Sequence, residues 1–253
     1  MIYFVSDFHL GIDTALSSLE RERLFVQFLE EIKADAEHIY ILGDLFDFWY
    51  EYKTVVPKGF VRVMGKLAEL SDSGVQLSFF TGNHDQWMRG YFEKELGIKV
   101  YYQPLQISIG ESSFYLGHGD GLGPGDKGYK FIKLIFESRI CRFLFGLIHP
   151  SIAIKLANGW SKNSRDGHTD DFTYHGKDKE WLFAYCNDQL DEMDIDYFIF
   201  GHRHLAIDLE LKNGKSRYIN TGEWMYSRSY VTFDGKMLKH HFYKNPDGKV
   251  YSD

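Results

Sequence analysis

Residues 2–9 have the sequence Ile-Tyr-Phe-Val-Ser-Asp-Phe-His, in which a short apolar run is followed at once by Asp7 and His9. The same arrangement recurs after the apolar runs at 39–42, 77–80, 114–116 and 197–200. Such runs are typical of buried β-strands. Because the carboxyl ends of neighbouring strands meet at one crevice in an open α/β sheet, we expect the polar residues to converge there. The clusters after the runs are Asp7-Phe8-His9, Gly43-Asp44, Gly82-Asn83-His84-Asp85, Gly117-His118-Gly119-Asp120 and Gly201-His202-Arg203-His204.

The order of the other elements predicts an α/β (α+β) fold. A capping box at Ser17-x-x-Glu20 is expected to open one helix, and a second helix is expected over 59–71. Strands that alternate with helices in this way are parallel. Shorter strands follow residue 99 and fill 206–243. We therefore expect two packed sheets with flanking helices, in a single domain over residues 1–253.

A basic and apolar helical segment, expected from about 126 to 160, interrupts this alternation. Between Lys127 and Arg165 there are eight basic residues and one acidic residue, Glu137, so the stretch carries 8 − 1 = +7 in a chain of net charge −7. The segment also has more apolar residues than a helix needs for the single face that it buries against the protein core. We interpret residues 122–170 as a helical cap that shelters acyl chains and rests on anionic lipid. The alternative is a helical hairpin packed on the sheet with solvated lysines.

Composition narrows the functional classes. A net charge of −7 argues against general nucleic-acid binding, which normally requires a basic face. No run of 18 or more uncharged apolar residues predicts a membrane-spanning helix. Cys141 and Cys186 lack metal-binding spacing and are expected to be reduced, structural thiols. These features predict a cytoplasmic protein with no obligate protein partner.

The clustered side chains have the chemistry of a two-metal site. Asp7 and His9, one residue apart at a strand end, can reach one ion, and the two oxygens of Asp44 suit a bridge between ions. Asn83 offers a neutral carbonyl, and no thiolate is present, so manganese, iron and zinc all remain possible. Each fragment alone is weak evidence, because a lone histidine is more often satisfied by a backbone carbonyl. The candidate ligands are Asp7, His9, Asp44, Asn83, His118, His202 and His204.

Taken together, the five motifs resemble those of the calcineurin-like metallophosphoesterases. This resemblance implies a metallophosphoesterase sandwich in which Asp7, His9, Asp44 and His204 hold one metal. It implies that Asp44, Asn83, His118 and His202 hold the other, with a water or hydroxide between the ions attacking phosphorus in line. The other histidines fit no ligand spacing and are expected to be structural or solvated: His38, His149, His168, His175, His240 and His241.

The same resemblance makes His84 and Asp85 the candidate catalytic residues. His84 stands where the family has a histidine that contacts the phosphate or the leaving oxygen, and a cationic ring there would offset developing charge. Asp85 is interpreted either as the carboxylate that holds the His84 ring or as the cap of a helix beginning near Gln86.

A second resemblance concerns the cap. Gly119-Asp120-Gly-Leu122, Asp126-Lys-Gly-Tyr129-Lys-Phe131 and the stretch ending in Ser161-Lys162 are similar to the UDP-2,3-diacylglucosamine diphosphatases of lipid A biosynthesis. This implies a manganese-dependent hydrolysis that yields UMP and 2,3-diacylglucosamine 1-phosphate at the inner leaflet. This chain has His84 where that family has arginine, and Tyr50-Glu51-Tyr52 follows Trp49 in place of Gly-Asp-Asp. Expected substrate-binding residues are Asp126, Tyr129, Ser161, Lys162 and Arg165.

Two other functions remain open from sequence. A phosphodiesterase for a soluble nucleotide, such as a dinucleoside polyphosphate, would use the same metals but has no need of the apolar cap. A non-catalytic scaffold of this fold would need none of the ligands, all of which are present.

Overall fold

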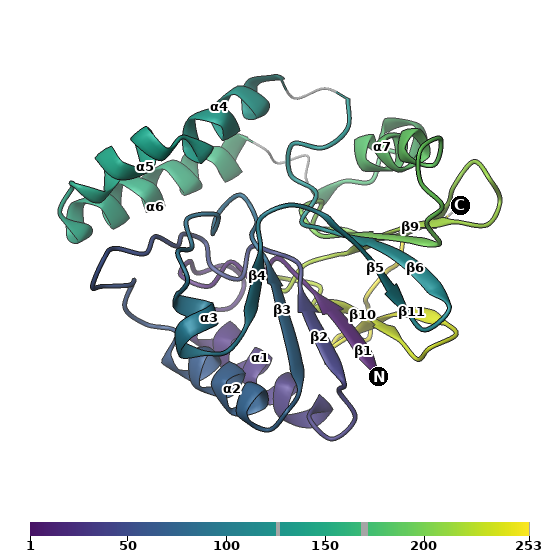
Figure 1. Ribbon diagram of the computed structural model, residues 1–253, viewed down its shortest axis with the longest axis horizontal. Coiled ribbons are helices and arrows are strands. Elements are labelled where there is room, and N and C mark those ends of the chain that lie inside the picture. The colour runs from purple at the N-terminus through teal and green to yellow at the C-terminus, as the bar shows by residue number, and fades with distance from the viewer. Residues whose placement is uncertain (125–126, 168–171, 253) are drawn as a thin grey trace.

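The computed structural model describes residues 1–124, 127–167 and 172–252, without the side chains of 127–129, 131–132, 158 and 160–167. Two stacked sheets form its body, with helices on the outside (Figure 1). The first sheet has the order β11-β10-β1-β2-β3-β4, and the second has the order β5-β6-β7-β9-β8. The first sheet consists of β1 (Ile2–Val5), β2 (His38–Ile41), β3 (Gln76–Phe80), β4 (Lys99–Tyr101), β10 (Ser229–Phe233) and β11 (Leu238–Phe242). The second consists of β5 (Leu105–Ile109), β6 (Ser112–Leu116), β7 (Tyr197–Phe200), β8 (Ala206–Glu210) and β9 (Arg217–Thr221).

Strand direction places the motifs on one edge of the molecule. Strands β1 to β4 are parallel to one another, as are β6, β7 and β9. Antiparallel pairs flank them: β10 pairs with β1 and with the edge strand β11 in the first sheet, and β5 and β8 form the two edges of the second. The mixed α/β fold with two sheets and flanking helices is therefore confirmed. All five motifs follow parallel strands, so their carboxyl ends share an edge.

Successive side chains of a strand point to opposite faces of the first sheet, so apolar residues form one buried cluster on each face. Tyr3 and Val5 of β1 face the helices, whereas Phe4 between them packs between the two sheets against Phe114 of β6. A third cluster, which includes Phe198 of β7, lies between the second sheet and a helix. The order of layers is therefore helix, sheet, sheet, helix.

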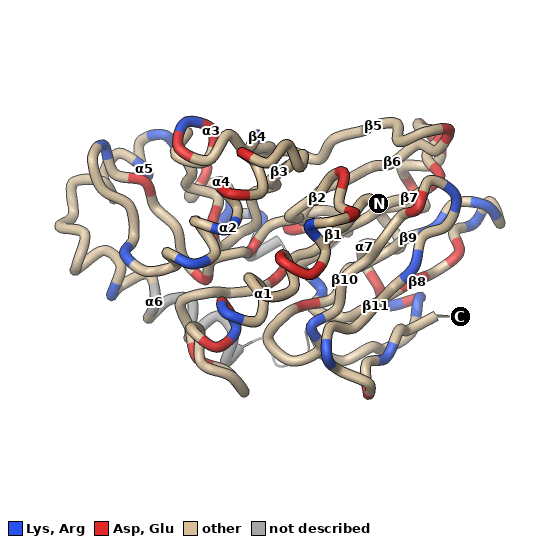
Figure 2. The backbone as a smooth tube through the Cα atoms, turned by 90° about the horizontal axis from the view of Figure 1, so that it is seen from below, with Lys and Arg blue, Asp and Glu red and all other residues tan. Residues whose placement is uncertain are grey.

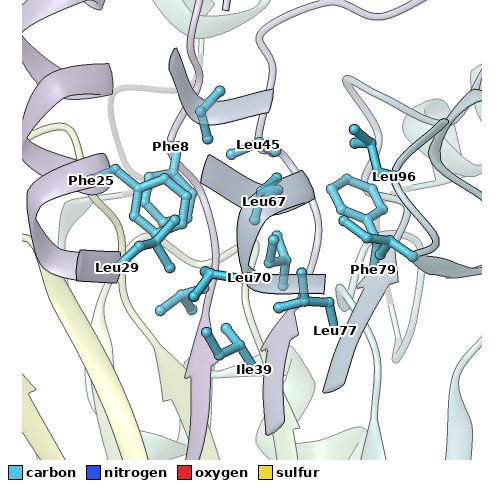
Figure 3. Close-up of a cluster of buried hydrophobic side chains, with 14 of the residues drawn as sticks. Phe8, Phe25, Leu29, Ile39, Leu45, Leu67, Leu70, Leu77, Phe79 and Leu96 are labelled. Atoms are coloured by element: carbon cyan, nitrogen blue, oxygen red, sulfur yellow. The ribbon is translucent and has the colours of Figure 1, made fainter. Parts of the chain in front are cut away.

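Three helices, α1 (Ser18–Ile32), α2 (Val61–Asp72) and α3 (Tyr91–Glu95), cover the outer face of the first sheet (Figure 1). The predicted capping box opens α1, since Ser17 accepts from the amide of Glu20 and the Glu20 carboxylate accepts from the amide of Ser17. Figure 3 shows the side chains that α1 and α2 bury against the strands, among them Phe25 and Leu67. The second sheet is covered by α7 (Trp181–Gln189), which is preceded by a 3-10 turn, η2 (Lys177–Lys179).

The cap contains three helices, α4 (Lys127–Glu137), α5 (Arg139–Gly146) and α6 (Pro150–Gly167), which lie together above one end of the sheets (Figure 1). The expectation of one long helical segment is wrong, because Ser138 caps α5 and α6 begins at Pro150. The core holds the cap through Trp87, whose Nε1 donates to the carbonyl of Phe136 at 2.8 Å. The Tyr50 hydroxyl donates to the carbonyl of Arg142 at 2.7 Å.

Charged positions do not divide the body into two halves. Figure 2 shows Lys and Arg interspersed with Asp and Glu along both sheets. In the described part of the chain, no helix combines the length and the apolar character needed to cross a bilayer.

Candidate metal centre

The seven candidate ligands lie together at the edge where the parallel strands end. Asp7 and His9 follow β1, Asp44 follows β2 and Asn83 follows β3, so four come from the first sheet. The other three follow strands of the second sheet, His118 after β6 and His202 and His204 after β7. The backbone joins the first two loops, because the amides of Phe8 and His9 both donate to the carbonyl of Asp44, at 2.9 and 3.0 Å.

Five of these seven residues have a left-handed backbone, which side chains other than glycine rarely adopt. A positive φ at a non-glycine residue is characteristic of functional sites, where the surrounding structure imposes it at roughly 1 kcal/mol or more. The φ angles are 57° at Asp7, 46° at His9, 53° at Asp44, 69° at His202 and 52° at His204. In both motifs with two ligands, the first and third side chains enter the cluster, whereas the middle residue points away: Phe8 packs against Phe25, and Arg203 bonds to Glu180.

In each of Asp7 and Asp44, one carboxylate oxygen accepts a hydrogen bond from a backbone amide, and the other faces the histidines of the cluster. Oδ2 of Asp7 accepts from the amide of His202 at 3.0 Å, and Oδ1 lies 3.2 Å from Nε2 of His204 and 3.8 Å from Nε2 of His9. Oδ1 of Asp44 accepts from the amide of His84 at 2.9 Å. Its Oδ2 lies 3.2 Å from Nε2 of His118 and 3.8 Å from Nε2 of His9. Asp44 therefore faces both halves of the cluster.

The second half of the cluster is centred on Asn83. Its Oδ1 lies 3.1 Å from Nε2 of His118 and 3.1 Å from Nδ1 of His202. The other nitrogen of the His118 ring, Nδ1, donates to the carbonyl of Leu42 at 2.8 Å, which fixes the ring with Nε2 toward the cluster. In the same way Nδ1 of His9 lies 3.3 Å from Oδ1 of Asp47.

Glycines before the ligands allow the loops to approach one another. Gly43 has φ +92°, and a Cβ there would lie 2.6 Å from Nδ1 of His118. A Cβ on Gly82 would collide with the carboxylate of Asp44. The Gly-Asp and Gly-Asn pairs of the motifs are thus steric requirements of the cluster.

Electrostatics favour a cation at this point. Burial opposes ionisation of Asp7, but hydrogen bonding from His204 and His9 outweighs it and holds the pKa of Asp7 well below its ordinary value. Burial likewise lowers the pKa of His9 and of His118, yet the neighbouring carboxylates outweigh it and raise each pKa to about 10. The site therefore takes up positive charge where the ligand atoms converge, and Oδ1 of Asp7 faces this point with Nε2 of His204 at 3.2 Å and Nε2 of His9 at 3.8 Å. Oxygen and imidazole donors so arranged fit divalent metals.

His84 and Asp85 occupy different environments. A ring nitrogen of His84 lies within 4.8 Å of the ligand atoms of His9 and Asp44, and its Nδ1 donates to the carbonyl of Asp47 at 2.9 Å. Burial lowers the pKa of His84. The ring is thus held at the rim of the cluster by the Asp47 carbonyl.

Both interpretations of Asp85 are wrong. Its carboxylate accepts from the amides of Gly82 at 2.8 Å and Leu45 at 2.9 Å, and so ties the β2 and β3 loops together. No helix begins near Gln86 in the described chain; α3 begins at Tyr91. Burial, with the charge of Asp44, raises the pKa of Asp85 to about 7.

The predicted substrate-binding residues of the cap are not placed by the structure. Asp126 lies outside the described residues. Tyr129 belongs to α4, and Ser161, Lys162 and Arg165 belong to α6, but their side chains are outside the described part. His168, expected to be structural or solvated, is also outside it.

Two buried arginines support the ligand loops and were missed from sequence. Arg21 donates from Nε to the carbonyl of Phe8 at 2.7 Å and from Nη2 to the carbonyl of His9 at 2.8 Å. Arg203, between two ligands, donates to Glu180 at 2.6 Å. The available signal for Arg21 was its place on the apolar stripe of α1, four residues before Phe25.

A cavity of about 660 Å³ adjoins the cluster, between the β3 and β4 loops and helices α4 and α5. A smaller pocket of about 40 Å³ includes His118 and shares Asp120 and Lys133 with the cavity, so the two are neighbours. The volume lies within the range of small-molecule sites.

Comparison with known proteins gives consistent matches. A family model described as calcineurin-like phosphoesterase matches residues 1–206. The chain is 38% identical to a UDP-2,3-diacylglucosamine hydrolase of Porphyromonas gingivalis, over 94% of this chain and 95% of that protein. It is 28% identical to the UDP-2,3-diacylglucosamine hydrolase of Haemophilus influenzae strain PittGG, over 88% and 90%. Among solved structures, Yfce, a phosphoesterase from E. coli, aligns with a TM-score of 0.46 and 16% identity, over 94% of this chain and 90% of that one.

Proposed function

Because the chain belongs to the calcineurin-like phosphoesterase family and is a hydrolase, we propose that it cleaves the pyrophosphate of UDP-2,3-diacylglucosamine. The products are UMP and 2,3-diacylglucosamine 1-phosphate, and the reaction belongs to lipid A biosynthesis. The main support for this substrate is the 38% identity to a UDP-2,3-diacylglucosamine hydrolase across nearly the full length of both chains. Such coverage includes the cap as well as the metal-binding motifs.

The seven clustered residues are proposed to hold two divalent metals. Asp7, His9, Asp44 and His204 form one group, and Asp44, Asn83, His118 and His202 form the other. The geometry supports this assignment, because Oδ2 of Asp44 is close to a ligand of each group: it lies 3.8 Å from Nε2 of His9 and 3.2 Å from Nε2 of His118. We propose Mn²⁺, since carboxylate, amide and imidazole donors without thiolate suit it. When bound, the metals neutralise phosphate charge and lower the pKa of the attacking water.

His84 is proposed to act on the phosphate. Its Nδ1 proton is committed to the carbonyl of Asp47, so the proton that a cationic ring would present to substrate is the one at Nε2. A phosphate oxygen that gains charge as the bond to the leaving group breaks would accept it. Asp47 then serves both sides of the site, because its carboxylate also lies 3.3 Å from Nδ1 of His9.

The cap is proposed to face the membrane. Its helices leave large apolar side chains exposed, including Ile140 at 70%, Phe143 at 62% and Leu147 at 68% on and just after α5. Arg139, also on α5, is exposed on the same short helix. Apolar side chains beside basic ones suit an anionic lipid surface, so we place the protein peripherally on the cytoplasmic face of the inner membrane.

The deciding experiment is turnover with Mn²⁺ of three substrates. The proposal expects UDP-2,3-diacylglucosamine to be hydrolysed to UMP at least a hundredfold faster than the deacylated sugar nucleotide or a dinucleoside polyphosphate. Equal rates on the deacylated compound would remove the acyl-binding role of the cap. Preference for the dinucleoside polyphosphate would make the protein a soluble-nucleotide phosphodiesterase.

A further inference from the structure

The cavity beside the metal cluster has a polar lining whose residues come from the core and from the cap. Gly82 and Asp120 lie at the end nearest the ligands, since each is within two residues of one, Asn83 or His118. Arg139 and Arg142 of α5 line it from the cap. A group bound at the metals can therefore continue into this space.

Basic side chains slightly outnumber acidic ones among the described residues of the cavity lining, with Arg89, Lys133, Arg139 and Arg142 against Glu93, Asp120 and Glu137. Lys133 is fixed by Asp120, with Nζ 2.7 Å from Oδ2 and 2.9 Å from the carbonyl. Arg142 is not comparably satisfied: its Nε is buried without an acceptor among the described residues, and Nη2 reaches the carbonyl of Glu137 only at 3.5 Å. A buried donor without an acceptor is unfavourable, so an acceptor that a ligand brings to Arg142 would be favoured.

Other lining residues suit a pyrimidine base. Tyr102 is 47% exposed and offers a ring, while its hydroxyl is tied to the carbonyl of Met88 at 3.3 Å. Gln86 and Gln103 also line the cavity. An amide carries both donors and an acceptor, which is what the imide edge of uracil requires. Acyl chains would gain little here, because they would desolvate polar groups without hydrogen bonding to them.

We propose that this cavity binds the UMP half of the substrate, with the phosphate toward Lys133 and Arg142 and the uracil toward Tyr102. This assignment rests on the proposed function. It divides the substrate in two, since the nucleotide enters the polar cavity and the diacylated sugar takes a separate path from the metals.

Product inhibition of the full-length enzyme loaded with Mn²⁺ tests the division, because each product reports on one half of the site. In Arg142→Met and, separately, Tyr102→Leu, the inhibition constant of UMP is expected to rise at least tenfold. The constant for 2,3-diacylglucosamine 1-phosphate is expected to change less than threefold. Calorimetric titration of UMP into each variant should show the same loss, and Arg62→Met, an exposed arginine on α2, should behave as wild type.

Two results would overturn the assignment. If the substitutions raise the inhibition constant of 2,3-diacylglucosamine 1-phosphate and leave that of UMP unchanged, the cavity holds the lipid half. If both inhibition constants stay at wild-type values, the cavity holds neither half, although turnover by the wild-type enzyme would still uphold the proposed function. Failure of the wild-type enzyme to hydrolyse the lipid substrate would overturn the proposed function, and the assignment with it.

Discussion

The Nε2 atoms of His9 and His204 lie 3.2 Å apart, and Oδ1 of Asp7 lies 3.2 Å from the second of them. At this separation one ring nitrogen can donate to the other, with the tautomer deciding which, and the ligand atoms of all three residues lie within 4.8 Å of one another. The backbones of all three residues are left-handed, so the fold itself imposes the convergence. The arrangement is that of a ligand set formed before the cation arrives.

Asp44→Asn should show whether one carboxylate serves two metals. The amide would still accept the His84 amide hydrogen bond but would supply no charge toward His9 and His118. Hydrolysis should fall on the order of 10³-fold, because each cation contributes several kcal/mol of charge stabilisation. Mass spectrometry should find fewer than two Mn²⁺ per chain, and Asp72→Asn, at an exposed position, should retain both. Full metal content with full activity in the Asp44→Asn variant would contradict the bridging role.

His84→Ala should separate catalysis from metal binding. The variant is expected to keep both metals but to lose roughly 10²–10⁴-fold in kcat, the range for a general acid. The measurement is the steady-state rate at matched metal occupancy. An unchanged kcat would remove His84 from the mechanism.

Arg21→Met should loosen the first ligand loop. Arg21 is fully buried and donates to the carbonyls of Phe8, His9 and Ile12. Its loss would leave these carbonyls without their donor and should lower the free energy of unfolding by roughly 3 kcal/mol. Because His9 moves with that loop, Mn²⁺ affinity by calorimetry should fall at least tenfold. Arg23→Met, on the exposed side of α1, is the matched control. Destabilisation with unchanged metal affinity would limit Arg21 to a structural role.

Acid stability should depend on His38, which lies outside the metal cluster. Burial lowers the pKa of His38 to about 4, below its ordinary value of 6.5, and its Nε2 lies 2.9 Å from the Ser78 hydroxyl. The unfolded chain therefore binds the proton first as pH falls, so stability present above pH 6.5 is progressively lost toward pH 4. Urea unfolding at pH 7 and pH 4.5 should show a smaller loss in His38→Gln than in wild type. The exposed His175→Gln should not differ from wild type in this respect.

Phe143→Glu and Leu147→Glu should weaken membrane binding. Each replaces an exposed apolar side chain of the cap with a negative charge, so co-sedimentation with phosphatidylglycerol vesicles should fall at least tenfold. The control is Val61→Glu, because Val61 is 74% exposed but lies on α2, outside the cap. Wild-type protein that remains in the supernatant would contradict membrane contact through the cap.

The sequence predicted the strands and the place of the ligands because both follow from local signals. An apolar run with polar residues at its carboxyl end marks a buried parallel strand, and β1, β2, β3, β6 and β7 all form at such runs. Capping chemistry at Ser17 was equally local. These features needed no knowledge of distant contacts.

Elements decided by distant contacts were not predictable in this way. Trp87 lies where a helix was expected, but it bonds to the cap carbonyl of Phe136, and Asp85 is drawn to amides some forty residues earlier, such as that of Leu45. Arg21 likewise finds its carbonyl partners in a preceding loop. Periodicity along one segment carries no record of such partners.

The left-handed turns at Asp7, His9, Asp44, His202 and His204 set two selective pressures against each other. Glycine at any of these positions would relieve steric crowding and yet delete a ligand. Laboratory evolution toward heat resistance, without a demand for turnover, would therefore drift toward inactive descendants. At the edge of the sheets that holds the ligands, the fold therefore accepts a less stable backbone because the side chains there are needed to bind metal.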